Sequence, residues 1–344
     1  MKDVAFVLLL LLVVNRGSGQ SQYKVMGIGF YNCENLFDPT HDPNKNDMDF
    51  TPDGLYHYTE QVYTRKLHNI ATVIEKMGMD ITPDGPAILG LAGVENEKVL
   101  NDLVNQPGIS NRNYKYIWFY TPDERGMGTA LLYNPKYLEV LHAEPLHVPL
   151  ETIRLKKAAR DVLHVTGVTA GDTVDILVNY WPSRQWGETM SAAARNVAAT
   201  VDKRIVDSLL KVNPARKILI IGDFSDNPTG ESISGVLEAK ASANQTDLTD
   251  IYNPWVSEYK KGLGTENYMG EWNLPDQIMV SGSFLKNDNH KWKYYNSEIY
   301  NRDFLVYSSG RYNGMPHKSF TATHVWDDGY SDHFPVLIYL IKKK

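Results

Sequence analysis

The sequence predicts an α/β fold in which a two-layer β-sandwich is flanked by helices. Three observations predict it: apolar runs of strand length outnumber helical patterns, the two kinds of pattern alternate, and no internal repeat or low-complexity linker divides the 344 residues. With 42% hydrophobic residues, the chain has enough apolar material for one large core. A single compact domain is the simplest organisation.

Strand patterns recur from the beginning of the chain to its end. Residues 87–94 form a short apolar run between Pro86 and Glu95, which suits a buried strand. Residues 162–169 and 173–180 flank a Gly-Asp turn and predict a hairpin. In chain order, strands are expected at 24–32, 87–94, 114–120, 129–133, 162–169, 173–180, 217–221, 277–280 and 335–341.

Helices are expected at residues 61–77, 98–104 and 189–210. The first has apolar residues at helical spacing, and the last is rich in alanine, with Arg195 expected on its polar side together with Lys203 and Arg204. Residues 243–273 look irregular and aromatic. Core packing is the common explanation of such aromatic residues, and the alternative is a substrate groove lined by Trp255, Tyr259, Tyr268 and Trp272.

The first residues have the pattern of a signal peptide. Lys2 precedes an apolar run over 4–14 that is too short to span a bilayer comfortably, and small residues follow at 17–19. We therefore expect a signal peptide at 1–20, a single domain at 21–344, and a secreted or periplasmic protein. No second long apolar run follows, so stable membrane insertion is not expected.

Charge and cysteine content exclude some classes of site. The net charge of −6 provides no general basic field for nucleic acid, although a bound metal would supply its own positive charge. Cys33 is the only cysteine, which excludes an internal disulfide and a cysteine-based zinc site. Its apolar neighbours predict a small buried filler.

Polar residues recur where the predicted strands end or begin, which is where ligand sites collect in α/β folds. Carboxylate and amide oxygens are the ligands that Mg²⁺ and Mn²⁺ prefer, and a histidine held by a carboxylate can bind phosphate or move a proton. The strand-end residues with this chemistry are Asn32, Glu34, Asn35, Glu95, Asn96, Glu97, Asn179, Arg184, Asp223, Asp276, Asp332 and His333.

Seven motifs carry a family resemblance: FYNCENLF, GVEN, RDVLHV, NYWPSR, GDFSDNP, PDQIMVS and SDHFPV. Their order over residues 25–341 resembles that of the endonuclease/exonuclease/phosphatase superfamily, which includes deoxyribonuclease, AP endonucleases, sphingomyelinases and inositol phosphatases. The resemblance points to a secreted bacterial branch. It implies a deoxyribonuclease-like four-layer α/β sandwich and a phosphoric ester hydrolase that uses Mg²⁺ or Mn²⁺.

The resemblance also implies roles for single residues. Asn32 and Glu95 would anchor the metal, and Asp332 would assist. Asp223 would orient or deprotonate the attacking water, and Asp276 would hold His333 against the phosphate. Substrate-binding candidates are Asn179 and the phosphate clamps Arg160 and Arg184.

Two positions depart from the family pattern. Tyr180 stands where many relatives have His, and a phenol donor to phosphate is plausible there because the AP endonuclease branch uses Tyr. Ser225 replaces the Asn that helps to orient the nucleophile, so altered activity is expected.

Each of these residues also has a structural interpretation. Asp276, Asp332 and His333 could form a buried polar network, Asn32 could cap a turn, and the two arginines could be solvated surface charges. Asp226 and Asn227 look like turn residues. Residues 42–53 resemble a calcium loop, but Asp47 and Asp53 stand where an EF-hand needs Gly and Glu. Ca²⁺ is therefore less expected than Mg²⁺ or Mn²⁺. A mobile loop at the mouth of the site is the preferred interpretation of this segment.

These observations favour a monomeric phosphodiesterase, by preference an endonuclease, that works by in-line attack of water. The substrate would be a phosphodiester or other phosphate ester, with nucleic acid as one option. The alternatives are a phosphomonoesterase, a sphingomyelinase-like phosphodiesterase that cleaves a lipid headgroup, and a catalytically silent binding module.

Overall fold

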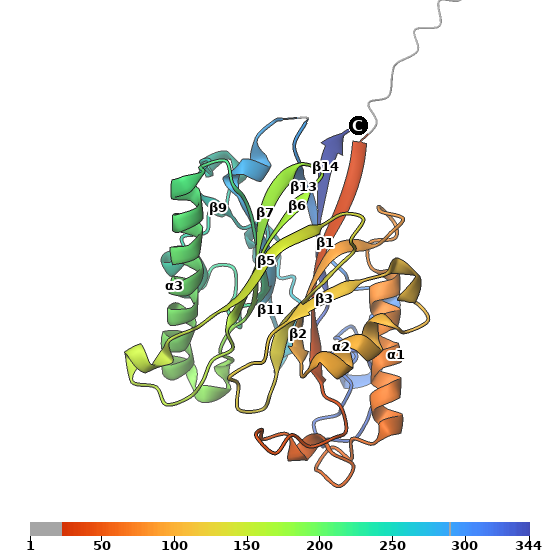
Figure 1. Ribbon diagram of the computed structural model, residues 1–344. Helices are drawn as coiled ribbons and strands as arrows, with labels where there is room; N and C mark the ends of the chain where they lie inside the picture. The colour runs from red at the N-terminus through yellow and green to blue at the C-terminus, as the bar shows by residue number, and fades with distance from the viewer. Residues whose placement is uncertain (1–22, 289) are drawn as a thin grey trace, which may run out of the picture.

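A computed structural model describes residues 23–288 and 290–344. Two six-stranded sheets lie face to face, and helices cover their outer faces (Figure 1). The predicted α/β sandwich flanked by helices is confirmed. The predicted signal peptide lies outside the described residues.

The first sheet has the strand order β13-β14-β1-β2-β4-β3. Strands β1 and β2 are parallel, and the other neighbours in this sheet are antiparallel. In chain order its strands are β1 (Tyr23–Leu36), β2 (Pro86–Val94), β3 (Lys115–Trp118), β4 (Gly128–Tyr133), β13 (Lys293–Ile299) and β14 (Val336–Lys343).

The second sheet has the order β5-β6-β7-β8-β12-β9. Here β7 and β8 are the parallel pair. Its strands are β5 (Glu139–Leu146), β6 (Val162–Thr169), β7 (Asp172–Tyr180), β8 (Lys217–Asp223), β9 (Ile251–Tyr252) and β12 (Asp276–Ser281). The predicted hairpin at 162–180 is confirmed as β6 and β7.

Helices α1 (Glu60–Lys76) and α2 (Glu97–Val104) lie beside the first sheet, and α3 (Glu188–Val212) lies along the second (Figure 1). All three were predicted, with ends that differ by at most two residues. The irregular stretch at 243–273 contains the short helix α4 (Val256–Lys260) and a small hairpin of β10 (Glu266–Tyr268) and β11 (Glu271–Asn273).

Strands β5 and β13 are absent from the sequence prediction. Both lie at sheet edges, and most of their residues are at least partly exposed. An edge strand with polar residues on both faces has no clear alternation of apolar and polar residues, so its pattern is weak.

Apolar side chains fill three layers. Phe30, Ile176, Ile221 and Ile338 belong to the cluster between the sheets, and further clusters lie under α1 and under α3. Each fully buried side chain of this size contributes roughly 1.5–3 kcal/mol. Cys33 is fully buried, as predicted.

One prediction about α3 is wrong. Arg195 was expected on the polar side of the helix, but only 2% of its surface is exposed. Its guanidinium lies 3.9 Å from Asp226, so a tertiary ion pair places it inside.

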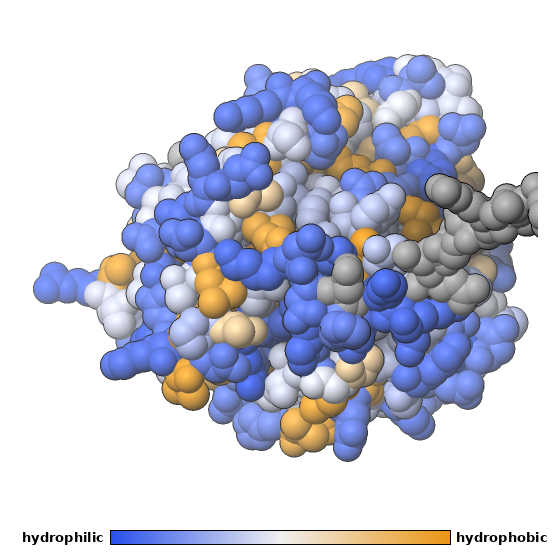
Figure 2. Space-filling model, turned by 90° about the horizontal axis from the view of Figure 1, so that it is seen from above, coloured by the Kyte–Doolittle hydropathy of each residue, from blue (hydrophilic) through white to orange (hydrophobic). Residues whose placement is uncertain are grey.

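The face that holds the start of β1 and the end of β14 is mainly hydrophilic, and its hydrophobic side chains form separate small groups (Figure 2). Within the described residues, no helix is long and apolar enough to cross a membrane. The strand ends that carry the predicted site lie at the opposite end of the sandwich from this face (Figure 1).

Candidate active site

The site is built where strands of both sheets end. Asn32 lies near the end of β1, Glu95 directly follows β2, and Asp223 is the last residue of β8. Asp276 opens β12, where it pairs in register with Asp223, and His333 comes just before β14. Residues up to 300 positions apart in sequence therefore come together because the sheets pack face to face.

Two hydrogen-bond donors orient the carboxylate of Asp223, and a hydroxyl lies nearby. The amide of Asn32 donates to its Oδ2 at 2.9 Å, and the backbone N–H of Ser225 donates to its Oδ1 at 2.8 Å. The Ser225 hydroxyl lies 3.4 Å from Oδ1 and 3.3 Å from the carbonyl of Trp181. Asp223 is therefore held in one orientation by both sheets.

Asp276 and His333 form a buried pair. Asp276 Oδ2 lies 2.6 Å from His333 Nδ1 and accepts a hydrogen bond from Thr265 at 2.5 Å. Burial opposes the charged imidazole, but the adjacent Asp276 carboxylate outweighs it and raises the pKa of His333 well above its ordinary value. Because Nδ1 is engaged by Asp276, Nε2 is left to face Asp332, whose Oδ1 is 3.8 Å away.

The donor set suits a divalent cation. One oxygen or nitrogen from each of Asp223, Asp276 and His333 lies within 4.8 Å of the others. Asp276 Oδ1 is buried and has no hydrogen-bond partner within the described residues. A buried, unpaired carboxylate oxygen is costly unless a cation or water satisfies it. This cluster differs from the predicted ligand set of Asn32, Glu95 and Asp332.

A bulge ends the pairing of β1 with β2. Glu34 and Asn35 have positive φ angles of 48° and 60°, and the register shifts between Asn32 and Leu36. Opposite them, Gly93 has a φ of 71°, and a Cβ at this position would lie 3.3 Å from Asn32 Oδ1. Bulges of this kind re-aim side chains beside active sites. The glycine of the GVEN motif therefore lets Asn32 approach β2 closely.

Glu95 is buried among acidic neighbours. Its Oε2 accepts a hydrogen bond from the backbone N–H of Asp38 at 2.7 Å. Burial, together with the charges of Asp38, Asp47 and Asp42, raises the pKa of Glu95 to about 8. A cation near this carboxylate would relieve that repulsion. The predicted metal-anchoring role of Glu95 thus has a local electrostatic rationale.

The 42–53 loop is tied down next to Glu95. Asp47 is 1% exposed, contacts the ring of His41, and accepts a hydrogen bond from the backbone N–H of Asp42 at 2.8 Å. These contacts use the Asp47 carboxylate, at the position where an EF-hand has Gly, to hold the loop together. The preference for Mg²⁺ or Mn²⁺ over Ca²⁺ stays a prediction.

A buried network at the end of β1 has no role among those predicted from the sequence. The Glu34 carboxylate accepts a hydrogen bond from the backbone N–H of Ser319 at 2.7 Å. The Lys66 ammonium donates to the Glu34 carbonyl at 2.8 Å and to the Ser319 hydroxyl at 2.6 Å. Burial and the charge of Asp332 raise the pKa of Glu34 to about 7. The available signal was Lys66 itself, a charged residue on the apolar face of α1.

The sequence of this site matches a known family. The model of the endonuclease/exonuclease/phosphatase family matches residues 27–342, which is nearly the whole chain. The chain belongs to this family. Membership places it among phosphoric ester hydrolases, a class that generally uses a divalent metal. A search of curated protein sequences finds no match.

Solved structures of the family share the fold. An endonuclease/exonuclease/phosphatase family protein from Bacteroides thetaiotaomicron superposes with a TM-score of 0.56 at 14% identity, covering 93% of this chain and 98% of the other. Humanized D. rerio TDP2 gives 0.54 at 10% identity, covering 92% and 98%. D. rerio TDP2 complexed with single strand DNA product gives 0.53 at 10% identity, with the same coverage.

Tyr180 and Arg160 lie together on the site side of β7. Tyr180 pairs in register with Asp223 on the parallel strand β8, so both side chains leave the same face of the sheet. The Arg160 guanidinium covers the Tyr180 ring at 3.9 Å and forms an ion pair with Asp123 at 3.1 Å. Arg160 therefore supports the tyrosine that replaces the family's histidine, and its predicted phosphate contact stays untested.

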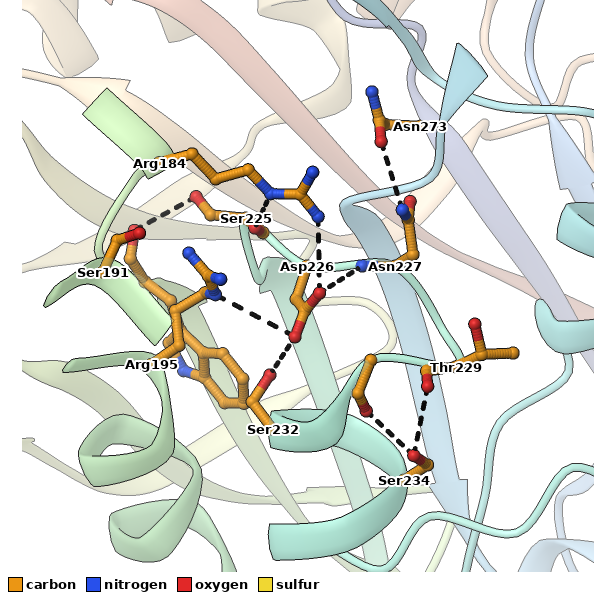
Figure 3. Close-up of polar contacts among 12 residues, drawn as sticks. Arg184, Ser191, Arg195, Ser225, Asp226, Asn227, Thr229, Ser232, Ser234 and Asn273 are labelled. Carbon is orange, nitrogen blue, oxygen red and sulfur yellow. Dashed lines mark hydrogen bonds and ion pairs between the residues drawn. The ribbon is translucent and has the colours of Figure 1, made fainter. Parts of the chain in front are cut away.

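Arg184 is tied to the loop that follows Asp223. Its guanidinium donates to the carbonyl of Ser225 at 3.3 Å and to Asp226 at 3.4 Å, and its side chain is 44% exposed (Figure 3). Asp226 also accepts a hydrogen bond from Ser232 at 2.7 Å and lies near Arg195. The turn role predicted for Asp226 thus extends to holding two arginines, and the phosphate contact of Arg184 stays a prediction.

The structure places Asn179 outside the site, contrary to the prediction. Asn179 is fully buried, and its amide oxygen accepts a hydrogen bond from the Trp181 indole at 2.8 Å. Trp181 packs in the cluster under α3. Because side chains alternate along a strand, Asn179 faces the helix layer while Tyr180 faces the site.

Proposed function

We propose that the protein is a divalent-metal-dependent phosphodiesterase whose preferred substrates are nucleic acids. The observation that carries the proposal is the Asp223–Asp276–His333 cluster, in which a buried carboxylate oxygen has no partner among the described residues. The groups that would hold or adjoin the ion are the carboxylates of Asp223, Asp276, Glu95 and Asp332 and the amide of Asn32. His333, protonated in this proposal, would stand beside the ion without coordinating it. When bound, the cation supplies charge neutralisation on the phosphate and acidifies water.

Asp223 is the proton acceptor in this proposal. Its orientation is set by Asn32 and Ser225, so its carboxylate can receive the proton of a water molecule that attacks phosphorus in line with the leaving oxygen. The nucleophile gains its alignment from this fixed geometry. This role requires a carboxylate, so Asp223→Asn, which replaces it with an amide, should abolish it.

In this proposal His333 donates a hydrogen bond to the phosphate. The Asp276 carboxylate keeps the imidazole protonated at neutral pH, so its Nε2–H can donate to a non-bridging phosphate oxygen. A positive donor at this place stabilises charge that develops in the transition state. Tyr180, held by Arg160, is placed to add a second donor.

The choice of nucleic acid rests on two supports. A structural neighbour of the same fold is complexed with single strand DNA product. The chain also has exposed Arg184 beside the site. The net charge of −6 favours a smaller phosphate ester as the second candidate, because polyanion binding usually calls for many Lys and Arg residues.

The test is a hydrolysis panel with Mg²⁺ or Mn²⁺ against plasmid DNA, RNA, a generic phosphodiester, a phosphomonoester and sphingomyelin. Glu95→Ala and Asp223→Ala should each lower the rate on the order of 10²-fold or more. Glu139→Ala, on the exposed edge strand β5, is the matched control and should keep full activity. Cleavage that survives both site substitutions contradicts the assignment, and metal binding without turnover of any substrate favours a silent binding module.

Export is a second part of the proposal. Lys2 and the apolar run at 4–14 support a cleaved signal peptide, and a secreted hydrolase would work in the periplasm or outside the cell. Mass spectrometry of the exported protein should find an N-terminus near residue 20. An intact N-terminus on a protein that stays in the cytoplasm contradicts export.

A further inference from the structure

A large cavity opens beside the catalytic cluster. Its volume is about 950 Å³, and Glu34 and Asp332 line the side nearest the cluster. Three separate segments form the other walls: residues 50–56, the tip of the β10–β11 hairpin, and a segment at 307–327 that we call the aromatic segment. A volume of this size is at the upper end for small-molecule pockets, so it has room for more than a phosphate group.

Aromatic rings dominate the apolar part of this cavity. Tyr56 stacks on Phe50 with ring centroids 4.2 Å apart and meets the edge of Phe320 at 5.0 Å. In the aromatic segment, the rings of Tyr307 and Tyr312 lie 5.5 Å apart. These contacts hold the rings against one another, so the apolar wall is formed in the absence of a ligand.

Tyr312 and one further ring, that of Tyr268, reach solvent at the cavity rim. Tyr268, at the β10–β11 hairpin, is 64% exposed, and Tyr312 is 41% exposed. Both side chains expose an aromatic face on which a flat ligand group can stack. Both lie at the mouth of a cavity that adjoins the catalytic cluster, where a substrate has to pass.

The charges in the cavity discriminate between occupants. Arg311 lies over the Tyr312 ring at 5.2 Å, and Lys318 lines the same wall. The acidic groups are Glu34, Asp332 and Asp327, which accepts a hydrogen bond from Tyr307 at 2.6 Å. An acyl chain would desolvate these ionisable side chains without pairing them. A nucleotide offers a flat base for the rings and phosphates for the two cations.

We infer that this cavity binds the base of an unpaired nucleotide next to the scissile phosphate. The inference rests on the proposed phosphodiesterase function and adds its substrate class, which is single-stranded nucleic acid or a frayed end. A base inside a duplex is stacked between its neighbours and cannot reach Tyr56 or Tyr312 without leaving the stack. Base–aromatic stacking then supplies affinity with little sequence preference.

The test measures binding separately from catalysis. The Asp223→Asn variant serves as the uncleaving background, and fluorescence anisotropy is measured in Mg²⁺ with three probes: a short single-stranded DNA, the same strand with stable abasic residues, and the blunt duplex. The normal single strand should bind about 10-fold or more tightly than the other two. Vesicles of phosphatidylcholine and sphingomyelin provide the lipid arm and should not compete.

Variants locate the binding to the cavity. In the same background, Tyr268→Ala and Tyr312→Ala should each weaken binding of the normal strand by about 5- to 100-fold and reduce its advantage over the abasic strand. Tyr295→Ala is the matched control, because Tyr295 is 62% exposed on β13 and does not line the cavity. It should leave both affinities unchanged, and unchanged melting temperatures show that the variants are folded.

Equal affinity for the normal and abasic strands, or tighter binding to vesicles, overturns the inference. Failure of the proposed function looks different, because wild-type protein would then hydrolyse no phosphodiester in the presence of metal. Hydrolysis of DNA with no preference for base-containing single strands would keep the phosphodiesterase and refute the base-binding cavity.

Discussion

Gly93 offers a sharp test of how the site is assembled. Its φ of 71° is a left-handed conformation, which costs a residue with a Cβ about 1–2 kcal/mol. An added Cβ would also lie 3.1 Å from the backbone N of Asn35 and 3.3 Å from Asn32 Oδ1, closer than ordinary contacts, which begin near 3.4 Å. The crowded groups belong to the bulge, and moving them costs about 1–3 kcal/mol more.

Gly171→Ala is the matched control. Gly171 has a φ of 85° in the β6–β7 turn, and nothing lies within 4 Å of an added Cβ. Both substitutions therefore share the backbone penalty, and only Gly93→Ala also crowds the site. Urea denaturation should show a loss of about 1–2 kcal/mol for Gly171→Ala and about 2–5 kcal/mol for Gly93→Ala.

Activity should separate the two variants further. Crowding shifts Asn32 by tenths of an ångström and disturbs its hydrogen bond to Asp223, so kcat/KM of Gly93→Ala should fall about 10-fold. Gly171→Ala should keep its activity. If both variants lose equal stability and both stay fully active, the close approach of β1 to β2 does not position the site.

Three further predictions concern ionisation and loop conformation. Burial and acidic neighbours raise the pKa of Glu95 to about 8, so the affinity of the metal-free protein for Mg²⁺ should rise up to about tenfold per pH unit below pH 8 and then level off. Calorimetry should find this slope reduced in Glu95→Gln, and an unchanged slope contradicts the reasoning. Asp276 raises the pKa of His333, and the proposed activity needs the protonated imidazole. The alkaline limb of the pH–kcat/KM profile should therefore move to lower pH in Asp276→Asn. A limb that does not move refutes the role of Asp276 as the partner of His333. Ser225 has a φ of 48°, which Asn tolerates better than Ser. Ser225→Asn should therefore raise the melting temperature by an amount that corresponds to less than about 1 kcal/mol, and it should raise kcat if the short hydroxyl limits orientation of the nucleophile. A lower kcat argues that Ser225 suits this site.

The order of the main strands and helices could be predicted because it depends on local pattern. Residues 61–77 repeat apolar side chains at helical spacing, and α1 forms there. The edge strands β5 and β13 could not be predicted, since they bury little and their side chains follow no strict alternation. The same limit applies to the aromatic segment. Its rings follow no periodic pattern in the sequence, and only the folded chain brings them together around one cavity.

Within the site, the sequence alone determined which functional groups are available for catalysis and metal binding. Asn32, Glu95, Asp223, Asp276 and His333 lie at strand ends, and the chain keeps them at one edge because strand direction dictates where those ends fall. Their motifs also identify the family, which the match over residues 27–342 shows.

Only the tertiary structure decided which neighbouring residues face the reaction. Alternation along β7 separates Asn179 from Tyr180, but the packing of α3 against one face determines that Asn179 is the buried one. Lys66 and Glu34 form their network with Ser319, a residue 253 positions from Lys66 in sequence. Such contacts depend on how distant segments pack together, and no local pattern of residues encodes them.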